Sequence, residues 1–275
     1  RYRPGLPLVL AGVSMLVEGG QKTAVVGRTG AGKSSLSAAL LRLVELGGGA
    51  ITIDGQNIRG LGLAVLRRAV TMIQQDAVLF AGTVRSNLDP LSEHADSQLE
   101  AALKTVEFSA HVGASSGLDV NVADGGANLS AGSRQLLGVA AALLRRSKIV
   151  LLDEATANCD FATDATIQRV IRASFRGATI LCIAHRLDTI IDYDSVIVMQ
   201  RGLAAEHGSP AELLDDERSL FSALVRDTGK QAARSLRASA CTARDERKTT
   251  AGLDATPRAT AVVDGVPRVT ASESV

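Results

Sequence analysis

The sequence predicts an α/β fold in which a mainly parallel sheet carries most of the core. Three observations support it. Apolar runs at residues 23–26, 149–152 and 179–183 have the length of buried strands. Helical segments separate these runs, and Leu36 and Leu40 in the first of them recur at helical spacing. A glycine-rich loop joins the first strand to that helix. Strands that alternate with helices favour a parallel sheet.

The individual elements follow in chain order. Strands are expected at residues 8–10, 14–17, 23–26, 51–55 (ending in a turn), 70–73, 149–152, 179–183 and 195–199. The earliest strands are expected to form a small antiparallel sheet. The helix that begins after the glycine-rich loop should run to Val44, because Gly47-Gly48-Gly49 stops it. Residues 92–144 read as a mainly helical insertion, and a further helix is expected around residues 165–175.

The domain organisation follows from a change of composition near Lys230. Residues 1–229 are expected to form one domain. After them the chain is rich in Ala, Thr, Arg and Ser, and it offers too few bulky apolar groups to offset the entropy of ordering. We therefore predict that residues 230–275 are disordered. The alternative is a partner-binding or regulatory arm, because hydroxyl side chains lie near basic residues there: Ser235, Ser239, Thr249 and Thr250.

Composition excludes several classes of protein. The net charge of +1 over 275 residues gives no general attraction to nucleic acid. The three cysteines, Cys159, Cys182 and Cys241, have no metal-type or redox-pair spacing, so they are expected to be free thiols of a reducing compartment. No apolar run approaches the roughly 20 residues that cross a bilayer. The start at Arg1 without Met suggests a segment of a longer polypeptide.

The most specific motif is Gly27-Arg28-Thr29-Gly30-Ala31-Gly32-Lys33-Ser34, between the strand at 23–26 and its helix. Glycines in such a phosphate loop let backbone N–H groups converge on phosphates. Lys33 is expected to reach the β and γ phosphates, and the Ser34 hydroxyl is expected to hold Mg²⁺. The motif predicts a P-loop NTPase core.

Two adjacent acids, Asp153 and Glu154, end the apolar run at 149–152. Asp153 can hold Mg²⁺ through water, while Glu154 can orient or deprotonate the water that attacks the γ-phosphate. The same pattern also arises where a strand merely leaves the core and meets solvent. The phosphate loop upstream favours the catalytic interpretation.

Leu129-Ser130-Ala131-Gly132-Ser133 stands between these two motifs, near the start of a predicted helix. This order of motifs resembles the ATP-binding cassette (ABC) family over about residues 2–226. The resemblance implies a P-loop NTPase core with a mainly parallel sheet, a small antiparallel β subdomain and a helical signature subdomain. It also implies ATP and Mg²⁺ as cofactors.

The resemblance assigns further site residues. His185 matches the switch histidine, Gln75 the Q-loop glutamine, Asp160 the acid of the D-loop (157–160), and Tyr2 an aromatic that stacks on adenine. Without it, His185 and Gln75 would read as ordinary residues at strand ends, and Tyr2 equally as a frayed terminal residue. The implied catalytic residues are Glu154, His185 and Gln75, and the metal ligands are Ser34, Gln75 and Asp153. The implied nucleotide-binding residues are Tyr2, Gly27, Thr29, Gly30, Ala31, Gly32, Lys33, Ser34, Ser35, Ser130, Gly132 and Asp160.

Finer matching points to subfamily C, the multidrug-resistance-associated-protein-like exporters. Residues 80–90 and 185–192 resemble the second ATPase domain of such proteins. Four positions depart from the pattern. Ser133 replaces the glutamine usual in the signature, Ala141 replaces an arginine, and Gln74 and Ala77 replace prolines beside the Q-loop glutamine.

The resemblance implies an ATPase domain of a membrane exporter, located at the cytoplasmic face. Its partners would be transmembrane domains and a second nucleotide-binding domain of the same polypeptide, closed head to tail. The alternative is a regulatory nucleotide-sensing domain of an ABC-type channel or receptor. A chromosome-maintenance ATPase would need a coiled-coil insertion between Gln75 and Ser130, and a translation-type protein would carry two cassettes and a basic surface; the sequence favours neither.

Overall fold

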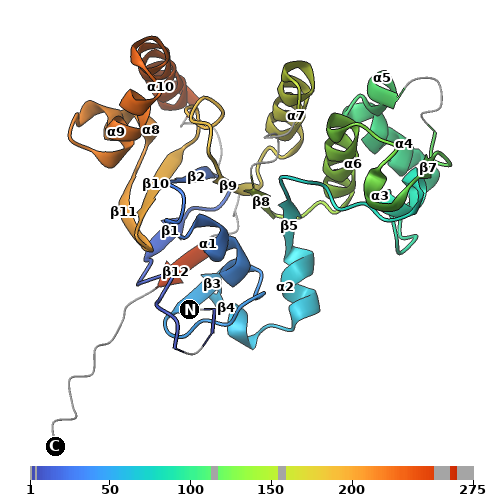
Figure 1. The fold of residues 1–275 in the computed structure, drawn as a ribbon, viewed down its shortest axis with the longest axis horizontal. Helices are drawn as coiled ribbons and strands as arrows, with labels where there is room; N and C mark the ends of the chain where they lie inside the picture. The colour runs from blue at the N-terminus through green and yellow to red at the C-terminus, as the bar shows by residue number, and fades with distance from the viewer. Residues whose placement is uncertain (1, 4, 113–116, 154–158, 251–260, 265–275) are drawn as a thin grey trace, which may run out of the picture. The chain divides into compact units, whose positions relative to one another are not determined.

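The computed structural model describes residues 2–3, 5–112, 117–153, 159–250 and 261–264 (Figure 1). The chain divides into two units, one formed by residues 1–67 and 179–275 and the other by residues 68–178. Each unit contains part of the α/β architecture that the sequence predicts. Among the described residues, no helix is both long enough and apolar enough to span a bilayer.

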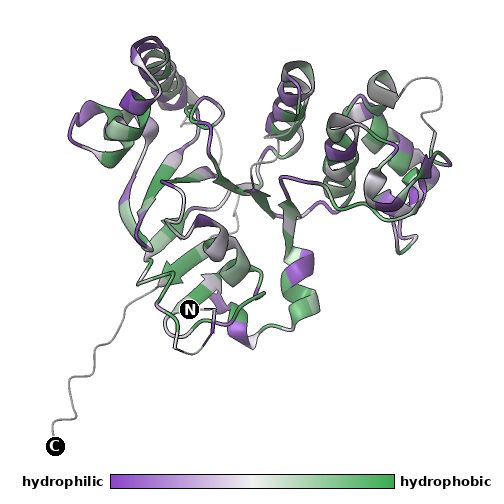
Figure 2. Cartoon of the chain, in the orientation of Figure 1, coloured by the Kyte–Doolittle hydropathy of each residue, from purple (hydrophilic) through white to green (hydrophobic). Residues whose placement is uncertain are grey.

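A mainly parallel sheet with strand order β11-β10-β2-β9 forms the core of the first unit (Figure 1). Its strands are β2 (Lys22–Val26), β9 (Thr179–Ile183), β10 (Ser195–Gln200) and β11 (Leu203–Gly208). The central strand β2 runs parallel to both β9 and β10, and β11 returns antiparallel to β10. The β9 residues are all buried, and the central strands are mainly hydrophobic (Figure 2). These strands match the predicted parallel core.

An antiparallel sheet of order β1-β12-β3-β4 lies in the same unit. It comprises β1 (Met15–Val17), β12 (Ala261–Asp264), β3 (Ala50–Ile53) and β4 (Gln56–Asn57), followed by the short 3₁₀ turn η1 (Ile58–Gly60). The small antiparallel sheet was predicted, but its strand β12 was not. The strand expected at residues 8–10 is not formed; residue 8 has no regular structure and residues 9 and 10 form a bend.

The helix after the phosphate loop, α1 (Lys33–Leu40), is shorter than predicted. Arg42 has a φ of 48°, which ends the helical path before Val44. Leu43 is 62% exposed, so it does not extend the buried helical face. The helix α2 (Leu63–Ala69) follows further along the chain.

The first unit also contains three C-terminal helices, α8 (Pro210–Asp215), α9 (Leu220–Asp227) and α10 (Lys230–Thr250). The predicted disorder from residue 230 onward is therefore wrong for 230–250 and for 261–264. One face of α10 is buried, formed by small or medium apolar residues at helical spacing: Ala233, Leu236, Ala240 and Ala243. Arg237 donates from Nη1 to the Leu214 carbonyl oxygen at 2.6 Å, which ties α10 to α8. Alanine side chains are small, but they let a helix pack closely against its neighbours. The prediction of disorder counted only bulky apolar residues and therefore missed this helix.

The second unit combines two parallel strands, β5 (Val70–Ile73) and β8 (Ile149–Asp153), with a set of helices. The helices are α3 (Val84–Leu88), α4 (Asp96–Thr105), α5 (Phe108–Val112), α6 (Ala131–Leu144) and α7 (Phe161–Ser174). A two-residue ladder between β6 (Gly82–Thr83) and β7 (Asn121–Val122), and the turn η2 (Asp124–Gly126), complete it. The predicted insertion at about 92–144 accordingly contains α4, α5 and α6.

Candidate functional site

The phosphate loop begins directly after β2, at Gly27. A Cβ atom at this position would lie 2.3 Å from the carbonyl oxygen of Met199 in β10, closer than any side chain tolerates. Only glycine therefore allows the loop to leave the sheet here. In the middle of the loop Thr29 and Gly30 are exposed, whereas the next residue, Ala31, is buried.

Lys33 and Ser34 occupy the first turn of α1, where the loop ends. The buried Lys33 donates from Nζ to the Gly27 carbonyl oxygen at 2.8 Å and lies 3.5 Å from the Arg28 carbonyl oxygen. Ser34 is exposed beside it. The loop thus holds an ammonium group next to a helix N-terminus, and both favour an anion.

Tyr2 is tied to the same helix. Its hydroxyl shares a hydrogen bond of 2.7 Å with Oγ of Ser35, the buried residue that follows Ser34. The Tyr2 side chain remains 52% exposed. The structure therefore brings Tyr2 and Ser35 together, while adenine stacking by Tyr2 stays a prediction.

His185 lies at the same sheet edge as the phosphate loop. Because β2 and β9 are parallel, with Val25 opposite Ile183, the residues that follow them emerge side by side. The Ala184 amide donates to the Val25 carbonyl oxygen at 3.1 Å. Gly27 and the exposed His185 both line an open cavity of about 590 Å³. The two segments, more than 150 positions apart in the numbering, therefore lie side by side at this edge.

Gln75 and Asp153 share an edge of the second unit. Ile73 of β5 pairs with Leu152 of β8, so the two polar side chains follow adjacent parallel strands at their carboxyl ends. Gln75 is exposed and Asp153 is half-buried. The predicted base Glu154, and the D-loop residues 157–158, lie outside the described residues.

The signature segment forms the N-terminus of α6. Ser130 is the N-cap: its Oγ accepts from the Ser133 amide at 3.0 Å and is 2.9 Å from the Ser133 Oγ. Ser133, which replaces the glutamine of the family pattern, is therefore buried and takes part in the cap. Ser130 itself is exposed at the tip of the helix.

Asp160 is the N-cap of the next helix, α7. Its carboxylate accepts from the amides of Ala162 and Thr163 at 3.1 Å each and from the Thr163 hydroxyl at 2.7 Å. The hydrogen bonds from Thr163 outweigh desolvation and lower the pKa of Asp160, so its carboxylate is ionised at neutral pH. Beside it, burial raises the pKa of the Cys159 thiol, and the nearby Asp164 and Asp160 add to this.

Thr163 links the signature to the D-loop, and sequence reasoning missed it. A Cβ on Gly132 would meet Thr163 Cγ2 at 2.8 Å and Oγ1 at 3.0 Å. The starts of α6 and α7 therefore pack directly on each other, with glycine as the only residue that fits. No motif signals this contact, because it depends on packing between segments thirty residues apart.

A second missed contact joins the signature helix to the Q-loop. The buried Gln135 donates from Nε2 to the Gln74 carbonyl oxygen at 2.8 Å. Because this acceptor is a backbone oxygen, the replacement of proline by glutamine at position 74 leaves it in place. The predicted residues thus fall into two groups, one in each unit.

Comparison with known proteins agrees with this geometry. The ABC transporter family profile matches residues 10–157. The chain is 48% identical over 230 residues to human ATP-binding cassette sub-family C member 3, covering 83% of this chain and 15% of that protein. It is 48% identical over 240 residues to ABC transporter C family member 5 of Dictyostelium discoideum, covering 86% of this chain and 16% of that protein.

A solved structure is also similar, that of a bacterial Atm1-family ABC exporter with ATP bound. The match has a TM-score of 0.74 and 33% identity, and it covers 81% of this chain and 39% of the exporter chain. This chain spans only about one sixth of the length of the two sub-family C relatives named above. The predicted α/β fold with a mainly parallel sheet is confirmed.

Proposed function

Because this chain belongs to the ABC transporter family and is an ATPase domain of that family, we propose that it couples ATP hydrolysis to export across a membrane. The main support for this proposal is the phosphate loop of the first unit. Lys33 and Ser34 begin α1 there, at the same sheet edge as His185. The loop supplies the anion site for the phosphates. His185 supplies a hydrogen-bonding group beside it.

The residues present fit a magnesium ion bound together with ATP. Ser34, Asp153 and Gln75 offer hydroxyl, carboxylate and amide oxygens, which are the hard ligands that Mg²⁺ prefers. Within the described ranges, no three His, Cys, Asp or Glu side chains form a metal cluster. When bound, Mg²⁺ neutralises charge on the β and γ phosphates.

We assign the protein's part in hydrolysis to three residues. Lys33 exchanges its contact with the Gly27 carbonyl for phosphate oxygens. Glu154 accepts a proton from the attacking water, and His185 contacts the γ-phosphate and helps to position the water. In our proposal Gln75, at the carboxyl end of β5, helps to hold the metal and the water.

A second nucleotide-binding domain would complete the site. Ser130 is exposed at the start of the 14-residue helix α6, where the helix dipole favours an anion. We propose that it meets the γ-phosphate of ATP held by the partner domain, in a head-to-tail pair. Asp160 would contact the same partner.

Transmembrane domains are the second partner class. After β5, the apolar residues Val78 and Phe80 are 67% and 72% exposed. We propose that membrane domains cover these side chains and that the chain lies at the cytoplasmic face. Similarity to subfamily C proteins and the sequences at 80–90 and 185–192 support a place as the second ATPase domain.

The catalytic assignment is tested with Glu154→Gln and Lys33→Ala in the transporter that contains this chain. Glu154→Gln removes the base but keeps shape, so ATP should still bind while hydrolysis falls about 100-fold or more. Lys33→Ala should instead weaken binding of a fluorescent ATP analogue. A Glu154→Gln protein with normal turnover would show that another group is the base.

Transport itself is tested in inverted vesicles. ATP-dependent accumulation of an amphipathic organic anion, abolished by Glu154→Gln, is expected for an exporter. An ATP-gated current that persists in Glu154→Gln, without accumulation, would support the channel-regulating alternative.

A further inference from the structure

The helix α10 holds the far end of the segment that begins with His185. Its residue Arg247 donates from Nη1 to the carbonyl oxygens of Asp192 at 3.1 Å and of Tyr193 at 2.8 Å. The same nitrogen lies 3.6 Å from Oδ1 of Asp194. One guanidinium group on α10 therefore contacts three consecutive residues just before β10 begins.

Asp194 connects this contact to the strand that leads into the phosphate loop. Its Oδ2 accepts from the amide of Lys22 at 2.8 Å, and its own amide donates to the Lys22 carbonyl oxygen at 3.0 Å. Lys22 is the first residue of β2. Arg247 is therefore joined through Asp194 to the central strand of the parallel sheet.

Residues 185–194 form a compact connection between β9 and β10. The Ile190 amide donates to the Leu187 carbonyl oxygen at 3.3 Å, and the Tyr193 amide donates to the Ile190 carbonyl oxygen at 3.0 Å. Four side chains of the segment are buried: Leu187, Ile190, Ile191 and Tyr193. Because close-packed segments transmit displacements, a shift at residues 192–194 should move the chain at His185.

The same helix also borders the beginning of the segment. The open cavity of about 590 Å³ that Gly27 and His185 line is lined as well by Ser235 and Leu236 of α10. Arg247 lies about three turns further along that helix. Contacts of α10 therefore reach both the cavity beside His185 and the far end of the segment.

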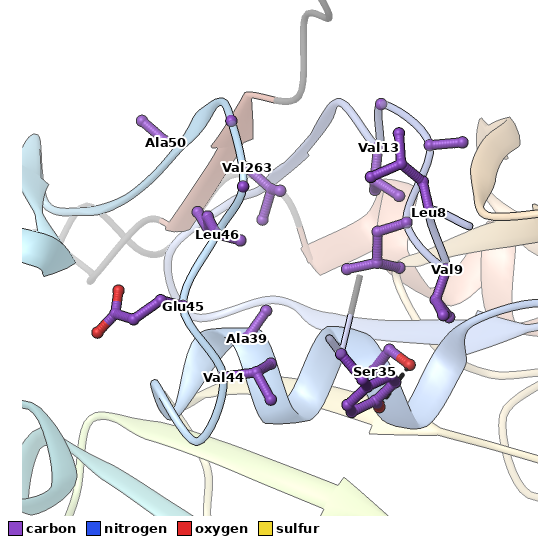
Figure 3. A pocket seen from close by; sticks show the side chains of 16 residues that line it. Leu8, Val9, Val13, Ser35, Ala39, Val44, Glu45, Leu46, Ala50 and Val263 are labelled. Atoms are coloured by element: carbon purple, nitrogen blue, oxygen red, sulfur yellow. Dashed lines mark hydrogen bonds between the residues drawn. The ribbon is translucent and has the colours of Figure 1, made fainter. Parts of the chain in front are cut away.

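A second cavity near the phosphate loop lacks this connection. It is a pocket of about 140 Å³ beside α1, and Figure 3 shows Ser35 and Ala39 of that helix with Leu8 across from them. Of the described residues that line this pocket, none belongs to α10 or to residues 184–194. The helix α10 therefore borders the His185 side of the loop and not the pocket beside α1.

Contacts other than those of Arg247 fix α10 on the first unit, where Figure 1 shows it beside α8 and α9. Arg237 donates to the Leu214 carbonyl oxygen, and Arg244 donates from Nη1 to Oδ2 of Asp215 at 3.2 Å. Both acceptors belong to α8. Arg247 thus reaches residues 192–194 from a helix that is anchored independently of it.

We propose that Arg247 is a positioning residue for ATP hydrolysis, which acts through residues 185–194 on the placement of His185. This inference rests on the proposed function, in which His185 contacts the γ-phosphate and helps to position the attacking water. Arg247 holds residues 192–194 to α10, so that His185 keeps one place at the carboxyl end of β9. Because Arg247 is not part of the phosphate loop, its loss should slow hydrolysis and leave the affinity for ATP unchanged.

Steady-state ATPase measurements on the transporter that contains this chain test the proposal. Arg247→Ala should lower kcat by at least about fivefold, since a misplacement of about 1 Å can cost about 100-fold in rate. The affinity for a fluorescent ATP analogue should stay within about twofold of the wild-type value. Arg247→Lys keeps a donor and the positive charge, so it should recover most of the lost kcat.

The matched control is Arg244→Ala, which removes the same charged group from the same helix but breaks a contact with α8 instead. It should leave kcat within about twofold of wild type. If Arg247→Ala is too unstable to assay, Arg247→Gln replaces it and should show the same fall in kcat relative to Arg247→Lys. Equal losses of kcat in the Arg244 and Arg247 variants would overturn the proposal, because α10 would then act only through general stability.

A double-mutant cycle with His185→Ala tests the route of the effect. If Arg247 acts through His185, Arg247→Ala should cause no further loss of kcat in the His185→Ala background. An undiminished effect of Arg247→Ala in that background would overturn the inference. Normal turnover of His185→Ala would refute the proposed role of His185 and this inference together, whereas a slow His185→Ala with a normal Arg247→Ala would overturn the inference alone.

Discussion

Replacement of Gly132 by alanine tests the packing that holds the signature helix. The new Cβ would lie 2.8 Å from Thr163 Cγ2, whereas carbon atoms normally pack at about 3.5–4.0 Å. The starts of α6 and α7 must therefore separate by several tenths of an ångström or more. Overpacking of this kind costs about 1–3 kcal/mol. Alanine's better helix propensity returns up to about 1 kcal/mol, which leaves a net loss of about 1 kcal/mol.

The assay is urea unfolding, with two comparisons that isolate the clash. Gly138→Ala on the same helix gains the same propensity but meets only the Ala77 Cβ, at 3.1 Å, so it should be no less stable than wild type. Thr163→Ser removes Cγ2 and keeps the hydroxyl that donates to Asp160. The double variant with Gly132→Ala should be more stable than the two single effects predict, by about 1 kcal/mol. A neutral Gly132→Ala, or additive effects, would refute the reasoning.

Three further outcomes follow from the described contacts. Asp160→Ala removes the N-cap of α7 and should lower the Tm at pH 7. Because folding lowers the pKa of Asp160, the stabilisation by its carboxylate is present above about pH 4 and is lost as the pH falls through the folded-state pKa. Plotted against pH, the Tm values of the wild type and the variant should therefore converge in acid. Leu236→Ala on the buried face of α10 should cost about 2 kcal/mol in urea unfolding, whereas the exposed Gln231→Ala should be nearly neutral. Asp227→Asn breaks the ion pair between Asp227 and Arg28, whose side chains are 65% and 84% exposed respectively. It should change the free energy of unfolding by less than about 0.5 kcal/mol. A larger loss would show that α9 anchors the phosphate loop.

Features set by local sequence were predictable. The strand, glycine-rich loop and helix around Lys33 follow from a contiguous pattern, because each glycine and the lysine act within a few residues of one another. The parallel strands that end at Asp153 and shortly before Gln75 and His185 were predictable for the same reason. Short, strongly apolar runs between polar residues have few alternatives to a buried strand.

Features that depend on distant partners were not predictable. The helix α10 buries mainly alanine, which scores as weakly apolar, and its arginines contribute by donating to carbonyl oxygens of other elements. The strand β12 has only four residues, and its pairing with β1 and β3 is wholly non-local. The requirement for glycine at position 132 comes from Thr163 rather than from the conformation of the loop.

The cap at the signature bears on how Ser130 could meet a phosphate. A serine hydroxyl has one donor and two acceptor positions. The Ser133 amide uses one acceptor position of Ser130, and if the Ser133 hydroxyl donates across the 2.9 Å contact, it uses the other. In that arrangement the single O–H of Ser130, an exposed residue, is not used by the cap. With Ser133 as the donor in that contact, the cap leaves the Ser130 O–H for an incoming anion. A glutamine at position 133 has no hydroxyl to place there, so the substitution in this chain changes how the donor is held while it preserves the amide that defines the cap.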